Sequence, residues 1–215
     1  MANKIAIIGS GGVAQTLAGG FLKHNYAVMM GTRNPEKLDE FKGKVQSDLS
    51  VSDVETTVDF SDIVVLAVKG SVAKSVVENL GSKLNGKTVI DPTNPISSDP
   101  PVNGVLRFFT NLDRSLIEEL QEAAPAANFV KAFSMIGGPH MVNANFNGEK
   151  PGMFICGNDD KAKAKVTEIC ELFGFEVEDF GKVEAGRAIE PLCMLWCIPG
   201  MTKGQWGHAF KMLKK

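Results

Sequence analysis

The chain has 215 residues, of which 44% are hydrophobic, so it can bury one substantial core with at most a small appendage. Its 23 basic and 25 acidic residues give a net charge of −2 without a dense Lys/Arg cluster, which argues against nucleic acid as a partner. The longest apolar runs are far shorter than the roughly 20 residues of a membrane span, and no signal peptide precedes residue 5. We therefore expect a cytoplasmic protein without a membrane partner.

Short apolar runs alternate with stretches of helical period, which is typical of parallel βαβ units. We expect buried strands at residues 4–8, 27–30, 63–68, 88–91, 129–133, 153–156 and 175–180. We expect helices at residues 13–23, 35–41, 72–80, 114–123 and 160–172, and a long loop at residues 97–101. Right-handed crossovers between these elements predict an α/β fold of the Rossmann type, with a doubly wound, mainly parallel sheet.

We divide the chain into a nucleotide-binding domain, residues 1–182, and a short C-terminal helical appendage, residues 183–215. The appendage has a helical pattern through about Ile198, a break at Pro199-Gly200, and a second helical stretch near its end. It is too short for a core of its own, so it should cover the ligand-binding edge of the sheet or pack on a second subunit. A homodimer through these helices would bury an apolar face formed by Leu192, Leu195, Trp196 and Pro199.

Four cysteines, Cys156, Cys170, Cys193 and Cys197, lie in apolar company and are expected to be small core side chains. Cys193 and Cys197 would share one side of a helix, a spacing that could hold a metal or a redox pair. No His or carboxylate lies at a matching helical spacing, so we predict no metal site.

The first expected strand is followed by a GxGxxA pattern that opens a helix. A glycine at the tight turn, a second that lets the backbone approach a pyrophosphate, and a small third residue are what a dinucleotide site requires. The helix N-terminus then offers N–H groups to the phosphates. A plain strand-to-helix turn is the alternative. The residues are Gly9, Ser10, Gly11, Gly12, Val13 and Ala14.

The second expected strand, residues 27–30, is followed by Gly31-Thr32-Arg33-Asn34. Neither the strand nor these four residues include an Asp or Glu. An acidic residue at this place would accept hydrogen bonds from a free ribose 2′-hydroxyl, and it would repel a 2′-phosphate. Thr32 can donate a hydroxyl, Arg33 can form a charge-assisted fork, and Lys37 adds a further positive charge. This stretch predicts NADP(H) as the cofactor, unless the two basic side chains are merely solvated.

The nicotinamide should lie beyond the carboxyl ends of the later strands, near the switch in strand order. We expect Ala67, Val68 and Lys69 to line the cofactor site, although Lys69 is equally compatible with a solvated surface. Asn94 is the candidate partner for the nicotinamide ribose, with turn formation before Pro95 as the alternative.

The acceptor pocket is assigned to Pro95, Met135, Ile136 and Gly137, although core packing would explain the two apolar side chains equally well. His140 is the candidate general acid, because the pKa of a histidine commonly lies near neutrality. A hydrogen-bonded structural histidine is the alternative.

Several stretches resemble the NADP oxidoreductase family of coenzyme F420 (deazaflavin)-dependent reductases and the related oxidoreductase domain of STEAP metalloreductases. They are "IAIIGSGGVAQTLA", "GTRNPEKL", "DIVVLAVKGSVA", "TVIDPTNP", "VKAFSMIGGPHM" and "GRAIEPLCMLW". The resemblance implies that Thr32, Arg33 and Lys37 surround a 2′-phosphate. Deazaflavin reductases carry a GxxGxxG loop where this chain has the shorter GxGxxA form, so the resemblance specifies the cofactor more closely than the acceptor.

The layout also resembles the N-terminal domain of β-hydroxyacid dehydrogenases, in which a following helix carries a Lys and an Asn for proton transfer. The corresponding residues 184–191 contain neither. Arg187 and Glu190 could form an ion pair, which we favour, or bind the acceptor. We therefore expect an NADPH-dependent oxidoreductase that transfers hydride to a deazaflavin- or flavin-like acceptor, because such a transfer needs stacking more than a proton acceptor. The alternatives are a non-catalytic NADP(H) redox sensor and a small carbonyl or imine reductase.

Overall fold

The computed structural model describes residues 3–45 and 49–215. Its strands are β1 (Lys4–Ile8), β2 (Ala27–Gly31), β3 (Leu49–Ser52), β4 (Ile63–Leu66), β5 (Thr88–Asp91), β6 (Asn128–Lys131), β7 (Gly152–Gly157) and β8 (Glu176–Asp179). Its α-helices are α1 (Gly12–Lys23), α2 (Asp39–Lys44), α3 (Val54–Asp59), α4 (Gly70–Leu80), α5 (Leu116–Ala123), α6 (Asp160–Leu172), α7 (Gly186–Ile189) and α8 (Leu192–Lys203). Four 3-10 turns complete the list: η1 (Pro35–Leu38), η2 (Gly81–Leu84), η3 (Gly138–His140) and η4 (Val183–Ala185).

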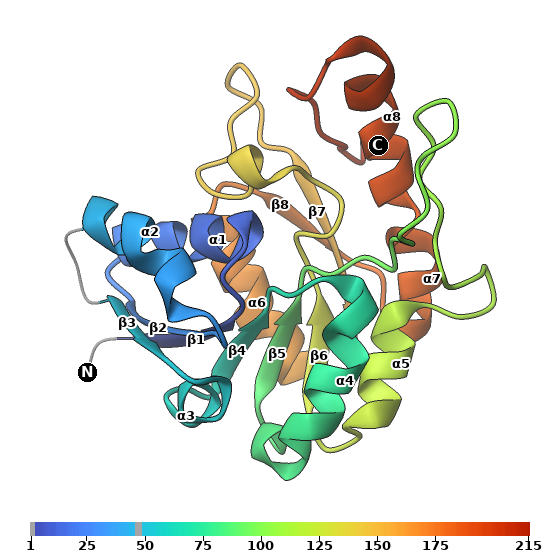
Figure 1. Ribbon diagram of the computed structural model, residues 1–215. Helices are drawn as coiled ribbons and strands as arrows, with labels where there is room; N and C mark the ends of the chain where they lie inside the picture. The colour runs from blue at the N-terminus through green and yellow to red at the C-terminus, as the bar shows by residue number, and fades with distance from the viewer. Residues whose placement is uncertain (1–2, 46–48) are drawn as a thin grey trace.

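The strands form one sheet in the order β3-β2-β1-β4-β5-β6-β7-β8 (Figure 1). Every neighbouring pair is parallel except β6 and β7, which run antiparallel. The order reverses at β1, because β2 lies on one side of it and β4 on the other. The predicted Rossmann-type, doubly wound and mainly parallel sheet is therefore confirmed.

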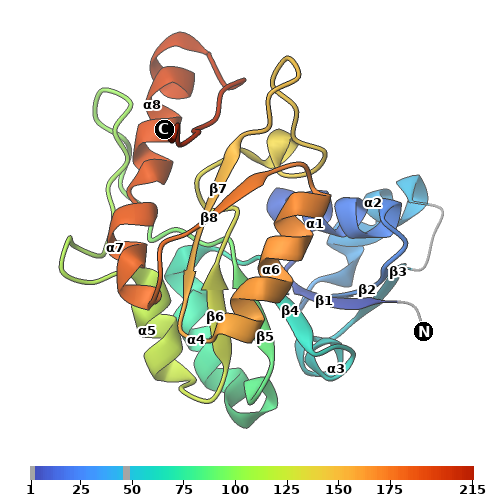
Figure 2. The same cartoon turned by 180° about the vertical axis from the view of Figure 1, so that it is seen from behind.

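Alternating side chains on each strand supply two hydrophobic layers. On β1, Ile5 and Ile7 pack with apolar residues of α1 and α6, whereas Ala6 and Ile8 pack with those of α3, α4 and α5. A strand that is buried on both faces reads as a continuous apolar run, and this is why β1 was visible in the sequence. Figures 1 and 2 show the helices on opposite faces of the sheet, with α4 and α5 in front in Figure 1 and α6 in front in Figure 2.

The predicted strands and helices lie within two residues of the observed ones for most elements. The predicted helix at residues 35–41 is instead the 3-10 turn η1 followed by α2. The strand β3 and the helix α3 were not predicted. The sequence of β3, "LSVS", offers only two apolar side chains. The predicted loop at residues 97–101 is part of a longer excursion between β5 and α5, braced by isolated bridges such as Ile96 to Phe108.

The C-terminal segment differs from its prediction at Pro199. Helix α8 continues through Pro199 and Gly200 to Lys203, and residues 205–215 form no helix or strand. Gly200 is needed at this place because a Cβ there would lie 2.2 Å from Trp206, which folds back onto the helix. The helix ends at Gly204, which has the left-handed conformation (φ 68°) common after a last helical turn. Within the described residues, no helix is long and apolar enough to cross a membrane.

Candidate functional site

The loop between β1 and α1 is shaped by Gly9. Its φ of +128° is strained for other residues, and a Cβ at this position would lie 2.1 Å from the carbonyl oxygen of Ala67. The Gly9 N–H donates to the carbonyl oxygen of Gly31 at 2.9 Å. The turn therefore packs directly against the ends of β2 and β4.

The N-terminus of α1 is open toward the space beyond the sheet. Gly11 is its N-cap and provides no side-chain acceptor, and no acidic residue lies in the first turn. A Cβ at Gly11 or Gly12 would meet nothing within 4 Å, whereas Ala14 is fully buried against the sheet. Such an N-terminus can receive an anionic group through its unpaired N–H groups and the helix dipole.

A cavity of about 840 Å³ lies beyond the carboxyl ends of β1, β2 and β4. Its walls come from the loops after these strands, from the start of α3 and from α4. The lining includes Gly9, Ser10, Gly11, Thr32, Arg33, Asn34, Lys37, Ala67, Val68 and Lys69, all of which the sequence had selected. Gly12, Val13, Ala14 and Asn94 are not part of the lining. Val13 and Ala14 turn toward the core beneath α1.

The loop after β2 presents its polar groups to this cavity. The Thr32 hydroxyl donates to the Ser10 hydroxyl at 3.2 Å and accepts from the Asn34 N–H at 3.1 Å, so it links the first two loops. The side chains of Arg33 and Lys37 are exposed, and neither has an ion pair within residues 3–45 and 49–215. Two cations at one rim suit a doubly charged anionic group.

Two acidic residues that the sequence analysis missed also line the cavity. Asp53 caps α3, since its carboxylate accepts from the Thr56 N–H at 2.8 Å and from the Thr56 hydroxyl at 2.7 Å. The hydrogen bond from the Thr56 backbone is the main reason that the pKa of Asp53 is lowered. Glu55 is exposed and lies 3.9 Å from Lys83. The Asp53 carboxylate is thus held at the start of α3 by hydrogen bonds within the protein.

Asn94 bridges the loops that follow β5 and β6. Its Nδ2 donates to the carbonyl oxygen of Ser134 at 2.7 Å, so the side chain does more than form the turn before Pro95. Asn94 Oδ1 and Ser134 Oγ are both buried without a hydrogen-bond partner in the described part of the protein. Two such groups side by side could receive a polar ligand.

The residues assigned to the acceptor pocket are mostly covered. Met135 is 2% exposed and Ile136 is 7% exposed, and Ile136 packs in the core beside α1. Gly137 lies beneath Trp196, because a Cβ there would approach Trp196 Cη2 to 2.3 Å. Trp196 was not among the predicted pocket residues, because an aromatic ring on an apolar helix gives no signal of which loop it covers.

Trp196 is fixed by the last residues of the chain. Its Nε1 donates to the carbonyl oxygen of His208 at 2.8 Å, and its ring stacks on the His208 ring at a centroid distance of 5.1 Å. The Trp206 ring lies 5.4 Å away on the same cluster. Residues 205–215 therefore close over α8.

His140 lies apart from the large cavity, in the turn η3. The His140 ring packs beside the Phe146 ring at a centroid distance of 5.2 Å. The backbone N–H of His140 donates to the carbonyl oxygen of Gly137 at 2.9 Å. The geometry brings His140 near Gly137 through the backbone alone. The general-acid role stays a prediction.

The expected ion pair between Arg187 and Glu190 is wrong. Arg187 pairs with Glu118, with its Nε 3.0 Å from Glu118 Oε2, and Glu190 turns inward to Lys131. The hydrogen bond from Arg187 is the largest cause that lowers the pKa of Glu118, to about 2. Positions 187 and 190 lie near the same face of a helical turn, and residue type alone did not reveal that each side chain pairs with a residue of another element.

The four cysteines are free thiols. Burial raises the pKa of Cys156 to about 12, as expected for a core side chain. Cys193 and Cys197 are hydrogen-bonded to each other, which raises the pKa of Cys193 and lowers that of Cys197. Within the described residues, no group of three or more His, Cys, Asp or Glu side chains could hold a metal ion.

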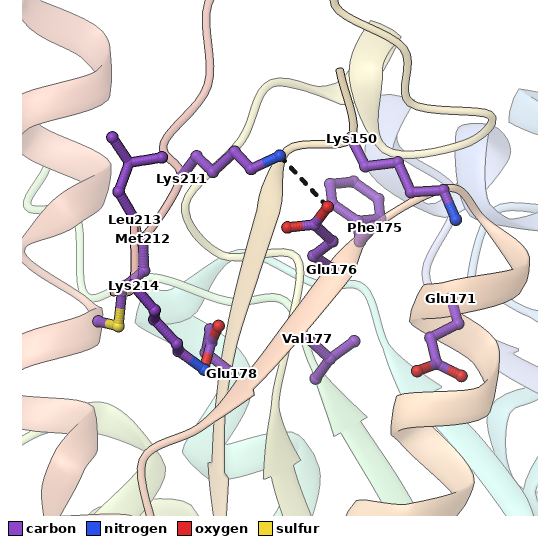
Figure 3. Close-up of a pocket in the computed structure, with 10 residues that line it drawn as sticks. All are labelled: Lys150, Glu171, Phe175, Glu176, Val177, Glu178, Lys211, Met212, Leu213 and Lys214. Atoms are coloured by element: carbon purple, nitrogen blue, oxygen red, sulfur yellow. Dashed lines mark hydrogen bonds and ion pairs between the residues drawn. The ribbon is translucent and has the colours of Figure 1, made fainter. Parts of the chain in front are cut away.

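A second hollow of about 680 Å³ lies between residues 211–214 and β8 (Figure 3). It is lined by charged side chains that neutralise one another: Lys211 Nζ lies 3.2 Å from Glu176, and Lys214 pairs with Glu178. The Phe210 carbonyl oxygen accepts from the Gly152 N–H at 2.8 Å, so the tail is attached to β7. This hollow lies away from the glycine loop and serves to seat the tail.

Comparison with known proteins identifies the relatives of this chain. Residues 4–95 match the family model described as NADP oxidoreductase, coenzyme F420-dependent. The chain is related to the coenzyme F420-dependent NADP oxidoreductases and to the STEAP oxidoreductases. It is 29% identical to metalloreductase STEAP3 of Rattus norvegicus over 92% of its own length, and it spans only 38% of that protein. It is 26% identical to the F420-dependent NADP reductase of Methanocaldococcus jannaschii, covering 89% of this chain and 90% of the relative.

The structural comparison agrees with the sequence comparison. A provisionally named F420-dependent NADP reductase from Arthrobacter sp. FB24 superposes with a TM-score of 0.88 at 26% identity, over 98% of this chain and 99% of that one. A reductive aminase from Aspergillus terreus in complex with NADPH superposes with a TM-score of 0.69 at 15% identity, over 95% of this chain and 64% of the aminase. The likeness to the aminase concerns the fold alone.

Proposed function

We propose that this protein is an NADPH-dependent oxidoreductase that transfers hydride between NADP(H) and a deazaflavin- or flavin-like acceptor. The observation that carries the proposal is that the Gly9 turn shares one cavity with the cationic rim formed by Arg33 and Lys37, beside the Thr32 hydroxyl. The turn suits the pyrophosphate and the rim suits the 2′-phosphate. The family match of residues 4–95 and the relatives that act on NADP support the same reading.

The chain's own residues then define how the cofactor would be held. The N-terminus of α1 would receive the pyrophosphate, and Thr32, Arg33 and Lys37 would surround the phosphorylated ribose. Asn94 Oδ1 and Ser134 Oγ, both without a partner among the described residues, are available to the nicotinamide end. Bound NADPH would supply the hydride, and Trp196, which covers Gly137, would help to exclude water from it.

A ring-shaped acceptor fits the surrounding residues better than an alcohol or a ketone. Within residues 184–191, Glu190 is buried against Lys131 and Arg187 is paired with Glu118. Neither of these two side chains is therefore free to move a proton at a substrate hydroxyl. Transfer of a hydride to a conjugated ring needs only that the nicotinamide and the acceptor ring stack in parallel. The accompanying proton would come from solvent.

The test is anaerobic NADPH consumption with a panel containing a deazaflavin, FMN, FAD, a ketone and a cyclic imine. We expect turnover with at least one conjugated ring carrier and a strong preference for NADPH over NADH. Tight NADPH binding without turnover on any acceptor would identify the protein as a redox sensor. Turnover confined to the ketone or imine would identify it as a small-molecule reductase. A homodimer through the C-terminal helices, the division after residue 182 and a cytoplasmic location stay predictions.

A further inference from the structure

Three charged side chains meet in the interior beneath the loop that carries Asn94. Lys131 is at the end of β6, Asp91 is at the end of β5, and Glu190 lies between α7 and α8. Lys131 and Asp91 are 0% exposed and Glu190 is 1% exposed. From the sequence, Glu190 was expected to pair with Arg187 or to bind the acceptor, and neither Lys131 nor Asp91 was predicted to belong to a site.

Lys131 makes three polar contacts, of which the one to the Thr93 carbonyl oxygen is a hydrogen bond. Its Nζ lies 2.6 Å from Asp91 Oδ2 and 2.9 Å from Glu190 Oε1, and it donates to the carbonyl oxygen of Thr93 at 2.9 Å. Burial alone would lower the pKa of Lys131, but the attraction of Asp91 and Glu190 outweighs it and raises the pKa. The lysine therefore stays charged throughout the ordinary pH range.

Glu190 also holds the start of α5. Its Oε2 accepts from the Leu116 N–H at 2.9 Å and its Oε1 accepts from the Ile117 N–H at 3.0 Å. One carboxylate from the C-terminal segment thus joins β6 to the N-terminus of α5, where the helix dipole favours a negative charge. The network spans three parts of the fold that are far apart in the sequence.

A buried ion network is seldom retained for stability alone, because well-packed apolar side chains of the same volume stabilise a core at least as well. The contacts of the network with Thr93 show which part of the fold it holds in place. Asp91 Oδ1 accepts from both the N–H and the hydroxyl of Thr93, at 2.9 and 2.6 Å. With its carbonyl held by Lys131, Thr93 has all its polar groups fixed by the network.

The next residue is Asn94, whose Oδ1 is buried without a partner in the described part of the chain. Its carbonyl oxygen is in close contact with the start of α4, because a Cβ at Gly70 would lie 1.9 Å from it. Thr93 on one side and Gly70 on the other therefore fix the backbone on which the Asn94 side chain stands. We therefore expect a displacement of Lys131 or Asp91 to displace Asn94 as well.

We propose that Lys131 and Glu190 are positioning residues, which hold the Thr93–Asn94 loop so that Asn94 meets the nicotinamide half of NADP(H). The proposal rests on the proposed function, and it assigns the C-terminal segment a role in cofactor geometry. Glu190 reaches the loop through Lys131 and Thr93 and makes no contact with the cofactor itself. The adenosine half, held by the loops after β1 and β2, lies outside the influence of the network.

The experiment compares two ligands on the full chain and on its Glu190→Gln variant. Glutamine keeps the volume, removes the charge, and turns one oxygen into a donor that faces N–H groups. NADPH spans both halves of the site, whereas 2′,5′-ADP contains only the adenosine half. We expect Glu190→Gln to weaken NADPH by about tenfold and to leave 2′,5′-ADP within about twofold of the parent protein, as measured by titration calorimetry.

Glu118→Gln is the matched control, because Glu118 also lies at the N-terminus of α5 but pairs with Arg187. It should lower the melting temperature and leave the ratio of the two affinities unchanged. In addition, Asn94→Ala should show the same selective loss, and the double variant Asn94→Ala/Glu190→Gln should lose no more than either single change. Additive losses in that cycle would overturn the proposal.

Equal weakening of both ligands by Glu190→Gln, or no weakening of either, would also overturn it. Should Glu190→Gln fail to fold, Thr93→Val tests the same link, because it removes only the hydroxyl bond to Asp91. Its NADPH affinity should then fall selectively, and an unchanged ratio would count against the proposal. The proposed function fails separately, if the parent protein binds neither NADPH nor 2′,5′-ADP.

Discussion

A side-chain carbon at Gly9 would lie 2.1 Å from the carbonyl oxygen of Ala67, so the turn after β1 is pressed against the end of β4. Gly9→Ala would also force a residue with a Cβ to a φ of +128°. We expect this change to lower the free energy of unfolding by about 1–3 kcal/mol, measured by urea denaturation.

Gly11→Ala is the natural comparison, because Gly11 has a φ of −79° and open space beside it. It should fold as well as the parent protein but weaken NADPH binding about tenfold or more, because its methyl group would occupy the space assigned to the pyrophosphate. Undiminished NADPH binding by Gly11→Ala would show that the phosphates lie elsewhere.

The ion pair between Glu118 and Arg187 predicts a pH-dependent contribution to stability. The pKa of Glu118 is lowered to about 2, mainly by its hydrogen bond with Arg187, from the usual 4.5. A lowered carboxyl pKa stabilises the folded state above pH 4.5 and ceases to do so as the pH falls through 2. Because the Arg187 side chain is 41% exposed, solvent screening limits the effect to about 1–2 kcal/mol.

Thermal unfolding of Glu118→Gln and of the parent protein from pH 2 to pH 7 measures this contribution. The difference in melting temperature should be largest above pH 5 and should shrink toward pH 2. A difference that stays constant over the range would mean that the stabilisation does not come from the carboxylate charge.

His140→Gln separates a structural from a catalytic histidine. The ring packs on Phe146 and the residue lies outside the large cavity, so we expect hydride transfer to a ring-shaped acceptor to keep its rate within about twofold. The measurement is steady-state NADPH oxidation across the pH range. Loss of activity by a hundredfold or more, within the usual range for a removed general acid, would favour the carbonyl or imine reductase reading.

The sheet could be predicted from the sequence because its inner strands are buried on both faces. The apolar residues inside the ranges 4–8 and 88–91 indicated both strands, and the strand ends were placed correctly. The strand β3 lies at the edge with serines at alternate positions, so it lacks that signal. The continuation of α8 through Pro199 was not predicted, and neither was the contact of Trp206 with Gly200, of which the sequence gives no sign.

The same division holds for the candidate site. The loops after β1 and β2 follow local rules of turn geometry and charge, so Gly9, Thr32 and Arg33 were found together in one cavity as expected. Trp196 and the partners of Glu190 are set by how the C-terminal segment packs on the sheet. Such tertiary contacts leave no periodic pattern in one sequence, and the ion pair between Arg187 and Glu190 was misassigned for this reason.

The most direct test of the account is a pair of titrations, NADPH and NADH, on the parent protein and on Arg33→Ala. Hydrogen bonds to a charged group contribute roughly 1.5–3 kcal/mol each, so Arg33→Ala should weaken NADPH binding about ten- to a hundredfold and leave NADH nearly unaffected. Equal loss of affinity for the two cofactors, or a parent protein that holds NADH as firmly as NADPH, would contradict the assignment of the cationic rim to a 2′-phosphate.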